Sequence, residues 1–504
     1  MTFVKKLKEW RMVMKNNEYL KSQDLLPSSR KERVVGTFGF ATVWVGMAIV
    51  ISGFAIGGAG MANLPLYWVL AASIVGSILI GLFMTITSDV GIEHGLSFPV
   101  YIRACFGTVG THIPSVIRAV TASLWFGINT YFGATAMNAI FNVLWGFDNW
   151  FICFVVFLII QMLNTILGIK AIERFANLAA PTVIIISIWM YVILGREAAA
   201  IDRSVWTWIE QPVSAGLMFT AFMLIVTGTM GYWATLANDL MNISRYVKAP
   251  QREKNWLRRN KGIFVGSVIV MPIVQTFVVA IGAIAYIAVG DYDPVVAIQL
   301  LTSSGIVLAV LFLMIVFAQW STNTPANVVP AATVFSNVGG PKVPYALGVV
   351  IAGAIAAFSR PWTILDVIIP FLVISGAILS ATVGIIIVDY YIIRKRRLNV
   401  PDLYESNGQY RFLHGINWAG MISFVAGGGV ALLFQTYSFF VGCFVAGILY
   451  YFLAKYWWFK KYKQAELEDP DDEKYLGMTV GHEWKIDLNP EEAVAQAASD
   501  SKAE

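Results

Sequence analysis

The chain has 504 residues, of which 57% are hydrophobic and only 13% are charged. Because soluble globular proteins carry roughly 25% charged residues, this composition excludes a soluble domain and predicts a polytopic membrane protein. The formal net charge of +5 needs no nucleic-acid partner, since basic loops on the cytoplasmic side of a membrane account for it.

The sequence carries no pattern typical of disulfide, metal or enzyme chemistry. The three cysteines cannot all pair and lie in or beside apolar segments, so we expect no disulfide framework. The four histidines lack metal-ligand spacing, and neither a phosphate-binding glycine loop nor a nucleophile elbow occurs. We therefore expect a protein that is not an enzyme and holds no cofactor. No apolar core precedes residue 38, so we expect no cleaved signal peptide.

Apolar runs of about 20 residues, the length that crosses the hydrocarbon of a bilayer, recur along the chain. Twelve such runs are predicted, at 38–60, 66–88, 114–140, 150–169, 176–195, 215–237, 262–290, 304–326, 344–358, 366–393, 415–436 and 439–458. Nearly all lysines and arginines lie in the two terminal segments, in loops after even-numbered runs or at inner ends of runs; the exceptions are Arg196, Arg203 and Arg360. This asymmetry predicts that both termini are cytoplasmic, in a multi-pass protein of the cell inner membrane.

Two of the runs carry glycine clusters that could interrupt a helix. One cluster lies at residues 46–60 of the first run, and the other at residues 227–233 of the sixth. Glycine also permits close helix packing in membranes, and that alternative stays open. The two runs are nevertheless five apart, in corresponding positions of two five-helix halves. This spacing favours an inverted-repeat transporter with its binding site at mid-membrane.

These features divide the chain into four predicted parts. Residues 1–34 form a cytoplasmic segment, residues 35–395 the inverted-repeat core, and residues 396–463 a cytoplasmic loop followed by the last two spans. Residues 464–504 are acidic and then rich in alanine and serine. Because such a composition buries little apolar surface, we expect this cytoplasmic tail to be disordered.

A polar stretch at the end of the eighth run carries the most informative chemistry. Residues 320–327 read Trp-Ser-Thr-Asn-Thr-Pro-Ala-Asn, and such side chains are costly in hydrocarbon unless they face a cavity, an ion or another helix. Pro325 removes one amide donor and frees a carbonyl near position 321. Hydroxyl oxygens beside a free carbonyl suit a hard, small cation such as sodium. Hydroxyls bonded to their own helix, with asparagines joining helices, are an equally good interpretation.

Aromatic and carboxamide side chains elsewhere could bind a flat ring. Trp125 and Asn129 are four residues apart in the third run and share one helix face. Stacking of a base on an aromatic side chain contributes about 1–3 kcal/mol. Trp233 could close on the opposite face of the ring, and Asn327 could contact its edge. Because the chain has 17 tryptophans, packing or a place at the membrane interface is the alternative for each.

Several motifs, in order along the chain, resemble those of one family. They are Glu32-Arg33 with Gly36 and Trp44, Trp125-Phe126-Gly127, Trp233-Ala234-Thr235, Trp320-Ser321-Thr322-Asn323 with Ala326-Asn327, Asp389-Tyr390-Tyr391, Arg394-Lys395-Arg396-Arg397, Asp402-Leu403-Tyr404 and Gly415-Ile416-Asn417-Trp418. The chain resembles the nucleobase:cation symporter-1 family, and looks closer to its hydantoin and allantoin permeases than to its cytosine permeases. The resemblance implies an all-α membrane fold: a LeuT-type five-plus-five inverted repeat with two further C-terminal helices.

Positions that match the family's motifs imply roles for individual residues. The resemblance implies a sodium ion between the first and eighth spans, bound by the carbonyl or hydroxyl oxygens of Gly46, Ile49, Ala318, Ser321 and Thr322. It implies a substrate held by Trp125, Asn129, Trp233 and Asn327, with Val50 also lining the site. It further implies an extracellular gate on the tenth span, at Leu372.

Among the departures from the hydantoin and allantoin members of the family, two fall in the substrate site. Val50 stands where those members have a carboxamide, and Asn129 where they have glutamine. Without the carboxamide the site no longer demands a partner there, so we expect a planar heterocycle with fewer polar edges on that side, or with a larger substituent.

We therefore predict a secondary active importer of a planar nitrogen heterocycle, of nucleobase, hydantoin or allantoin type, coupled to a cation, with sodium favoured over protons. Its partners are this small-molecule substrate and the lipid bilayer. The alternatives are an amino-acid or amine carrier on the same fold, a proton-coupled nucleobase or vitamin permease, and a channel or sensor without coupled transport.

Overall fold

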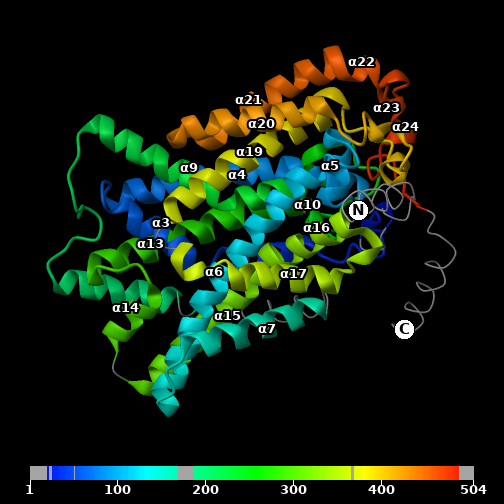
Figure 1. The fold of residues 1–504 in the computed structure, drawn as a ribbon. Helices are drawn as coiled ribbons and strands as arrows, with labels where there is room; N and C mark the ends of the chain where they lie inside the picture. Colours follow the sequence, from blue (N-terminus) through cyan, green and yellow to red (C-terminus); the bar gives the residue numbers. More distant parts are fainter. Residues whose placement is uncertain are drawn as a thin grey trace, which may run out of the picture.

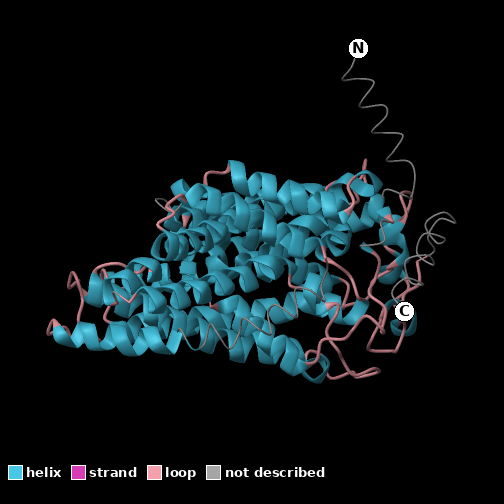
Figure 2. Ribbon diagram, turned by 90° about the horizontal axis from the view of Figure 1, so that it is seen from below, coloured by secondary structure: helices cyan, strands magenta, loops and turns pink. Residues whose placement is uncertain are grey.

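The structure is a computed structural model that describes residues 20–21, 25–49, 51–167, 185, 187–302, 304–364 and 368–486. Within these ranges the chain forms helices joined by loops and turns, without a strand (Figure 2). The prediction of an all-α protein is confirmed for this part of the chain.

The helices fall into long elements and short connecting ones. The long elements are α2 (Thr37–Ala48), α3 (Ile51–Gly60), α4 (Leu66–His94), α6 (His112–Trp145), α7 (Trp150–Ile166), α9 (Ala215–Asp239), α13 (Met271–Val289), α15 (Gly305–Asn323), α16 (Val329–Gly339), α17 (Tyr345–Phe358), α19 (Ile368–Ile387), α20 (Trp418–Leu433) and α21 (Ser438–Leu453). The short elements are α5 (Phe98–Phe106), α10 (Met241–Ser244), α11 (Trp256–Arg259), α12 (Lys261–Phe264), η3 (Val265–Val270), α14 (Pro294–Leu301), η4 (Thr324–Val328), η5 (Gly340–Lys342), α18 (Pro361–Ile364), η7 (Val388–Ile393), η8 (Pro401–Tyr404), η9 (Gln409–Arg411), η10 (Gln435–Tyr437), η11 (Ala454–Trp458), α22 (Phe459–Lys461), α23 (Ala465–Glu468) and α24 (Asp472–Tyr475).

Many of these helices have the length and composition of membrane spans. In the described part of the chain, six continuous helical runs qualify, and the bent pair α2 and α3 makes up to seven. Three shorter apolar helices, α7, α17 and α20, add to these. The predicted runs coincide with these helices or with α6, except the run at 176–195, which lies partly outside the described residues. A polytopic membrane protein is therefore supported, whereas the number of twelve spans stays a prediction.

The long helices lie side by side in one bundle (Figure 1). α4 packs against α9 and α13, and α13 also packs against α3. α6 packs against α15 and α17, and α19 joins the two groups through α9. α20 and α21 pack on each other and on α19, along one side of the bundle. This packing brings α2, α6, α9 and the end of α15 around one interior region.

The first span is bent, as its glycines predict. The axes of its two helical parts meet at 62°, and Ile49 ends α2 with φ −89° and ψ 89°, outside the helical region. Where a helix ends, its last carbonyl groups have no partner within the helix. The bend therefore offers backbone oxygens to other ligands in the interior.

The sixth span is not broken, and that prediction is wrong. α9 runs without interruption from Ala215 to Asp239. A Cβ atom added to Gly231 would lie 3.0 Å from the carbonyl oxygen of Leu372 in α19, so the glycine allows two helices to approach closely. A glycine within a helix costs only about 1 kcal/mol relative to alanine, which tertiary packing readily offsets.

The expected disorder from residue 464 onward does not hold for residues 464–486. In this segment, α23 and α24 lie at one end of the bundle (Figure 1). Glu466 is fully buried and forms an ion pair with Arg394. The hydroxyl of Tyr410 donates to Glu466 Oε1 at 2.8 Å. Residues 487–504 lie outside the described residues.

A second buried carboxylate fixes the rest of this segment. Glu93, at the end of α4, accepts bonds from the backbone N–H of Thr479 at 3.0 Å and from its hydroxyl at 2.6 Å. Arg259 lies 2.8 Å from Asp89 and 3.0 Å from Glu93. Burial lowers the pKa of Arg259, but these two carboxylates outweigh it and raise the pKa above its ordinary value. The acidic composition of the tail pointed to disorder because the residues that hold this segment in place are distant from it in sequence and cannot be recognised from its composition.

Candidate functional site

The polar stretch at residues 320–327 lies where α15 changes into the π-helical turn η4. Pro325 is in the first turn of η4. Because proline has no backbone N–H, it cannot donate the hydrogen bond of a regular α-helical turn at this position. Asn323 donates to the carbonyl of Phe126 at 3.0 Å and to Gln161 Oε1 at 2.9 Å. It thus joins α15 to α6 and α7, which is the role in helix packing that was the alternative to ion binding for this stretch.

Oxygen atoms from α2 and α15 converge beside this turn. The hydroxyl of Thr322 donates to the carbonyl of Gly46 at 2.7 Å and to that of Ala318 at 3.1 Å. The hydroxyl of Ser321 donates to Ala318 at 3.0 Å. A Cβ added to Gly46 would lie 3.8 Å from Ser321 Oγ, and Ile49 is buried at the end of α2. Hydroxyl and carbonyl oxygens are the donors that hard cations prefer.

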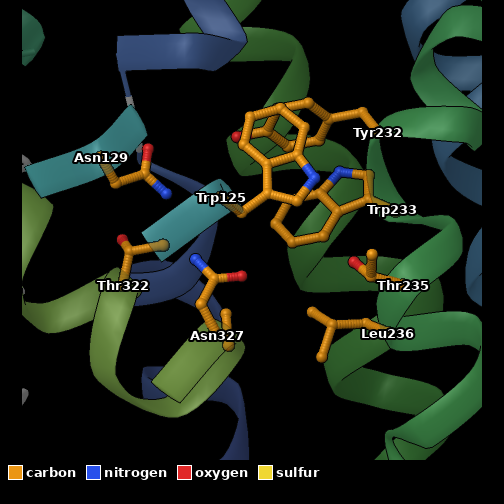
Figure 3. A pocket seen from close by; sticks show the side chains of 9 residues that line it. Trp125, Asn129, Tyr232, Trp233, Thr235, Leu236, Thr322 and Asn327 are labelled. Carbon is orange, nitrogen blue, oxygen red and sulfur yellow. The ribbon is translucent and has the colours of Figure 1, made fainter. Parts of the chain in front are cut away.

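A small cavity of about 20 Å³ adjoins these oxygens (Figure 3). It is lined by Trp125, Asn129, Tyr232, Trp233, Thr235, Leu236, Thr322, Ala326 and Asn327. Small-molecule sites span roughly 300–1,000 Å³, so the walls of this cavity must move apart to admit a ring. The sequence had proposed four of these residues for a ring-binding site, and the fold brings those four together from α6, α9 and η4.

The indole rings and the carboxamides approach the cavity from different sides (Figure 3). Trp125 and Trp233 are 5% and 3% exposed, so neither lies at the membrane surface. Asn129 and Asn327 face them, with Thr322 between the two carboxamides. The wall thus combines aromatic surface for a flat ring with polar groups for its edge, which is the usual chemistry of a small-molecule site.

Sequence reasoning missed Tyr232, Ser52 and Phe371. The Tyr232 ring makes edge contacts with Trp125 at 5.2 Å and with Trp233 at 5.0 Å between centroids. Its hydroxyl lies 2.8 Å from Ser52 Oγ. The Phe371 ring lies 5.4 Å from Trp125. Only the position of Tyr232 next to Trp233 could have drawn attention to it.

Two predicted residues are not placed in the cavity wall. Leu372 is buried on α19, where its carbonyl meets Gly231 of α9, and its neighbour Phe371 is the residue that contacts Trp125. A gating role of Leu372 stays a prediction. Val50 lies outside the described residues.

Comparison with known proteins assigns the chain to a family. The family model described as "Permease for cytosine/purines, uracil, thiamine, allantoin" matches residues 27–457. The chain belongs to this family, the nucleobase-cation-symport-1 family. It is therefore a membrane transporter rather than an enzyme.

Individual relatives and structures agree with this assignment. The permease is 28% identical to the hydantoin permease of Microbacterium maritypicum over 458 residues, covering 89% of this chain and 92% of the relative. It is 28% identical to the allantoin permease of Bacillus subtilis, covering 86% and 93%. The solved structure of Mhp1, a nucleobase-cation-symport-1 transporter in a closed conformation with bromovinylhydantoin bound, matches with a TM-score of 0.83 and 25% identity, covering 89% of this chain and 98% of Mhp1.

The fold also matches more widely. The inward-facing structure of Mhp1 matches with a TM-score of 0.77, lower than the closed one. A Na⁺-coupled sialic acid symporter matches with a TM-score of 0.58 at 11% identity, covering 89% of this chain, which shows a shared fold alone. The predicted LeuT-type fold is supported by these similarities.

A buried ion pair holds the permease together beside the cavity. Arg118 of α6 lies 3.0 Å from Asp239 of α9, and both side chains are fully buried. Arg118 also donates to the carbonyls of Thr235 at 3.0 Å and Ala326 at 3.4 Å, two residues that line the cavity. One guanidinium thus ties α6, α9 and η4 together, and any movement that separates these elements must replace its bonds.

Proposed function

We propose that this permease is a secondary active importer of a planar nitrogen heterocycle, of nucleobase, hydantoin or allantoin type, by cation symport with sodium as the coupling ion. The observation that carries the proposal is the position of Thr322. Its side chain lines the aromatic cavity and also bonds to Gly46 at the bend of the first span. One residue therefore belongs both to the cavity proposed to bind the ring and to the oxygen cluster, by which we mean the oxygens of Gly46, Ile49, Ala318, Ser321 and Thr322.

The cavity supports the substrate part of the proposal. A flat ring would stack on Trp125, with Trp233 on its other side and with Asn129 and Asn327 at its edge. Base stacking on an aromatic side chain contributes about 1–3 kcal/mol, and a few hydrogen bonds added to it give micromolar affinity. The named relatives are permeases for hydantoin and allantoin, rings with the amide groups that such carboxamides pair with.

The oxygen cluster supports the ionic part. In the structure the Thr322 hydroxyl bonds directly to Gly46, so an ion between them would take the place of that hydrogen bond. Sodium bound there would hold α2 against α15 and order the wall of the cavity. The substrate would favour the ion in return, because coupling between two binding sites is reciprocal.

Transport would then follow from alternating access. Ion and ring bind from outside, α19 closes over the ring near Leu372, and the group containing α3, α4, α9 and α13 moves against the rest to open the cavity inward. We further propose twelve spans in the inner membrane with both termini cytoplasmic, on the distribution of lysine and arginine.

Binding and uptake by the purified full-length chain test the proposal. A panel of heterocycles is screened for thermal stabilisation with and without sodium, and the ligands found are tested for uptake into proteoliposomes against a gradient. We expect sodium-dependent stabilisation and accumulation of at least one flat heterocycle. Accumulation driven by a proton gradient would show that protons, and not sodium, are the coupling ion. Equilibration without accumulation would indicate a channel or sensor. Accumulation of an amino acid, and of no heterocycle, would contradict the proposed substrate class.

A further inference from the structure

We propose that Tyr232 is a positioning residue that determines which rings the cavity accepts, because it orients the carboxamide of Asn129 through Ser52. The inference rests on the proposed function and deepens it. The expected substrate edge presents a carbonyl to Asn129 and an N–H to Asn327, as an imide can, and not an amino group to Asn129.

A short chain of hydrogen bonds connects these three residues. The hydroxyls of Tyr232 and Ser52 are 2.8 Å apart, and Ser52 donates to Asn129 Oδ1 across a long 3.5 Å. All three are buried, at 7%, 3% and 3% exposure. The chain joins α9 to α3 and α6 along one wall of the cavity.

The number of available hydroxyl protons determines which residue donates in each of these two hydrogen bonds. A serine hydroxyl has one proton, and Ser52 gives it to Asn129, so Tyr232 must donate to Ser52. In the reverse direction the Tyr232 proton would have no acceptor among the described residues. Asn129 Oδ1 is thus occupied, and its Nδ2 points into the cavity as a donor (Figure 3).

The opposite wall carries the complementary group. Asn323 donates to the backbone carbonyl of Phe126, which can only accept, so the orientation of its amide is fixed. Its Oδ1 accepts a bond of 2.9 Å from Asn327 Nδ2. Asn327 Oδ1 therefore faces the tryptophans as an acceptor (Figure 3).

The two carboxamides set the pattern that a ring must match. The cavity offers a donor on Asn129 and an acceptor on Asn327. A ring whose edge presents a carbonyl to Asn129 and an N–H to Asn327 satisfies both. A ring that turns an amino group toward Asn129 leaves two donors facing each other, and such unpaired polar groups reduce affinity strongly.

Two matched ligand pairs test the inference on the full-length chain in nanodiscs: uracil with cytosine, and hydantoin with 2-iminohydantoin. Dissociation constants are measured by calorimetry in sodium buffer. Wild type is expected to bind the oxo member of a pair at least about tenfold more tightly, as one unpaired buried group implies. Tyr232→Phe keeps the ring but frees Asn129 to rotate, so this preference should fall about tenfold, with the melting temperature little changed. Ser52→Ala should do the same by removing the middle of the chain.

Thr229→Val is the matched control, since it removes a buried hydroxyl of the same helix that lies outside the cavity wall and the chain of bonds; it should leave the preference ratio unchanged. Should Tyr232→Phe fail to fold, the smaller Ser52→Ala change decides alone. The inference is overturned if wild type shows no preference, if the ratio persists in the folded variants, or if neither pair binds while other heterocycles do. Absence of binding by every heterocycle in the wider panel would instead refute the proposed function.

Discussion

Replacing Thr322 by valine separates the proposed ion site from the substrate site. Valine keeps the shape of the side chain and removes the hydroxyl that bonds to Gly46 at 2.7 Å and to Ala318 at 3.1 Å. Loss of a hydrogen bond costs about 1 kcal/mol of stability, so the variant should fold with a slightly lower melting temperature. For the ion, the variant lacks one of five proposed oxygen ligands.

The expected effect is on the coupling between the two ligands. Coupling free energies between sites are about 1–3 kcal/mol, so sodium should raise substrate affinity about 5- to 150-fold in wild type. In Thr322→Val we expect less than about a twofold effect at the same sodium concentration, because the ion no longer orders the cavity wall. Substrate affinity is measured by tryptophan fluorescence in sodium buffer and in choline buffer of equal ionic strength.

A neighbouring threonine provides the control. Thr324 lies two residues further, and its buried hydroxyl has no hydrogen-bond partner in the described part of the chain. Thr324→Val makes the same chemical change in the same stretch and should retain the full sodium effect. An undiminished sodium effect in Thr322→Val would show that the ion binds elsewhere.

Three further variants test the packing and chemistry around the site. Trp125→Ala removes the stacking surface and should weaken substrate binding by about 1–3 kcal/mol, measured by calorimetry; unchanged affinity would remove this residue from the site. Arg118→Met leaves the buried Asp239 without its partner and should lower the free energy of unfolding by about 3–5 kcal/mol. The double variant with Asp239→Leu should recover much of that loss, and no recovery would mean that the two charges do not act as a pair. Glu466→Gln weakens the ion pair with Arg394 and should cost about 1–3 kcal/mol in thermal unfolding, while a tail that contributes nothing to the fold would give no change.

The sequence drew attention to four residues that line the cavity because their chemistry is visible locally; that they bind a ring stays a prediction. An indole and a carboxamide four residues apart on a helix must share one face, so the spacing alone predicts that Trp125 lies beside Asn129. Polar residues at membrane depth are costly without a partner, which singled out Thr322 and Asn327. The fold brings all four to the cavity wall.

The roles of Asn323 and Asn327 could not be separated in this way. Both are carboxamides on the same turn of one helix, and the sequence allowed either to bind a ligand or to join helices. In the structure Asn323 bonds to α6 and α7, and Asn327 faces the cavity. Which side chain meets a neighbouring helix depends on the rotation of α15 and η4 about their axis, and only packing sets that rotation.

Composition and periodicity determined that this chain is a bundle of apolar helices, because burial in a bilayer requires hydrophobic residues and internally paired backbone groups. The tertiary structure alone decided that α9 continues through its glycines, that residues 464–486 fold, and that Tyr232 reaches Ser52. Each of these depends on a partner distant in sequence: the carbonyl of Leu372 for Gly231, Arg394 for Glu466, and a serine on α3 for the tyrosine on α9. Contacts of this kind arise from the way helices pack together, and no local pattern of residues specifies them.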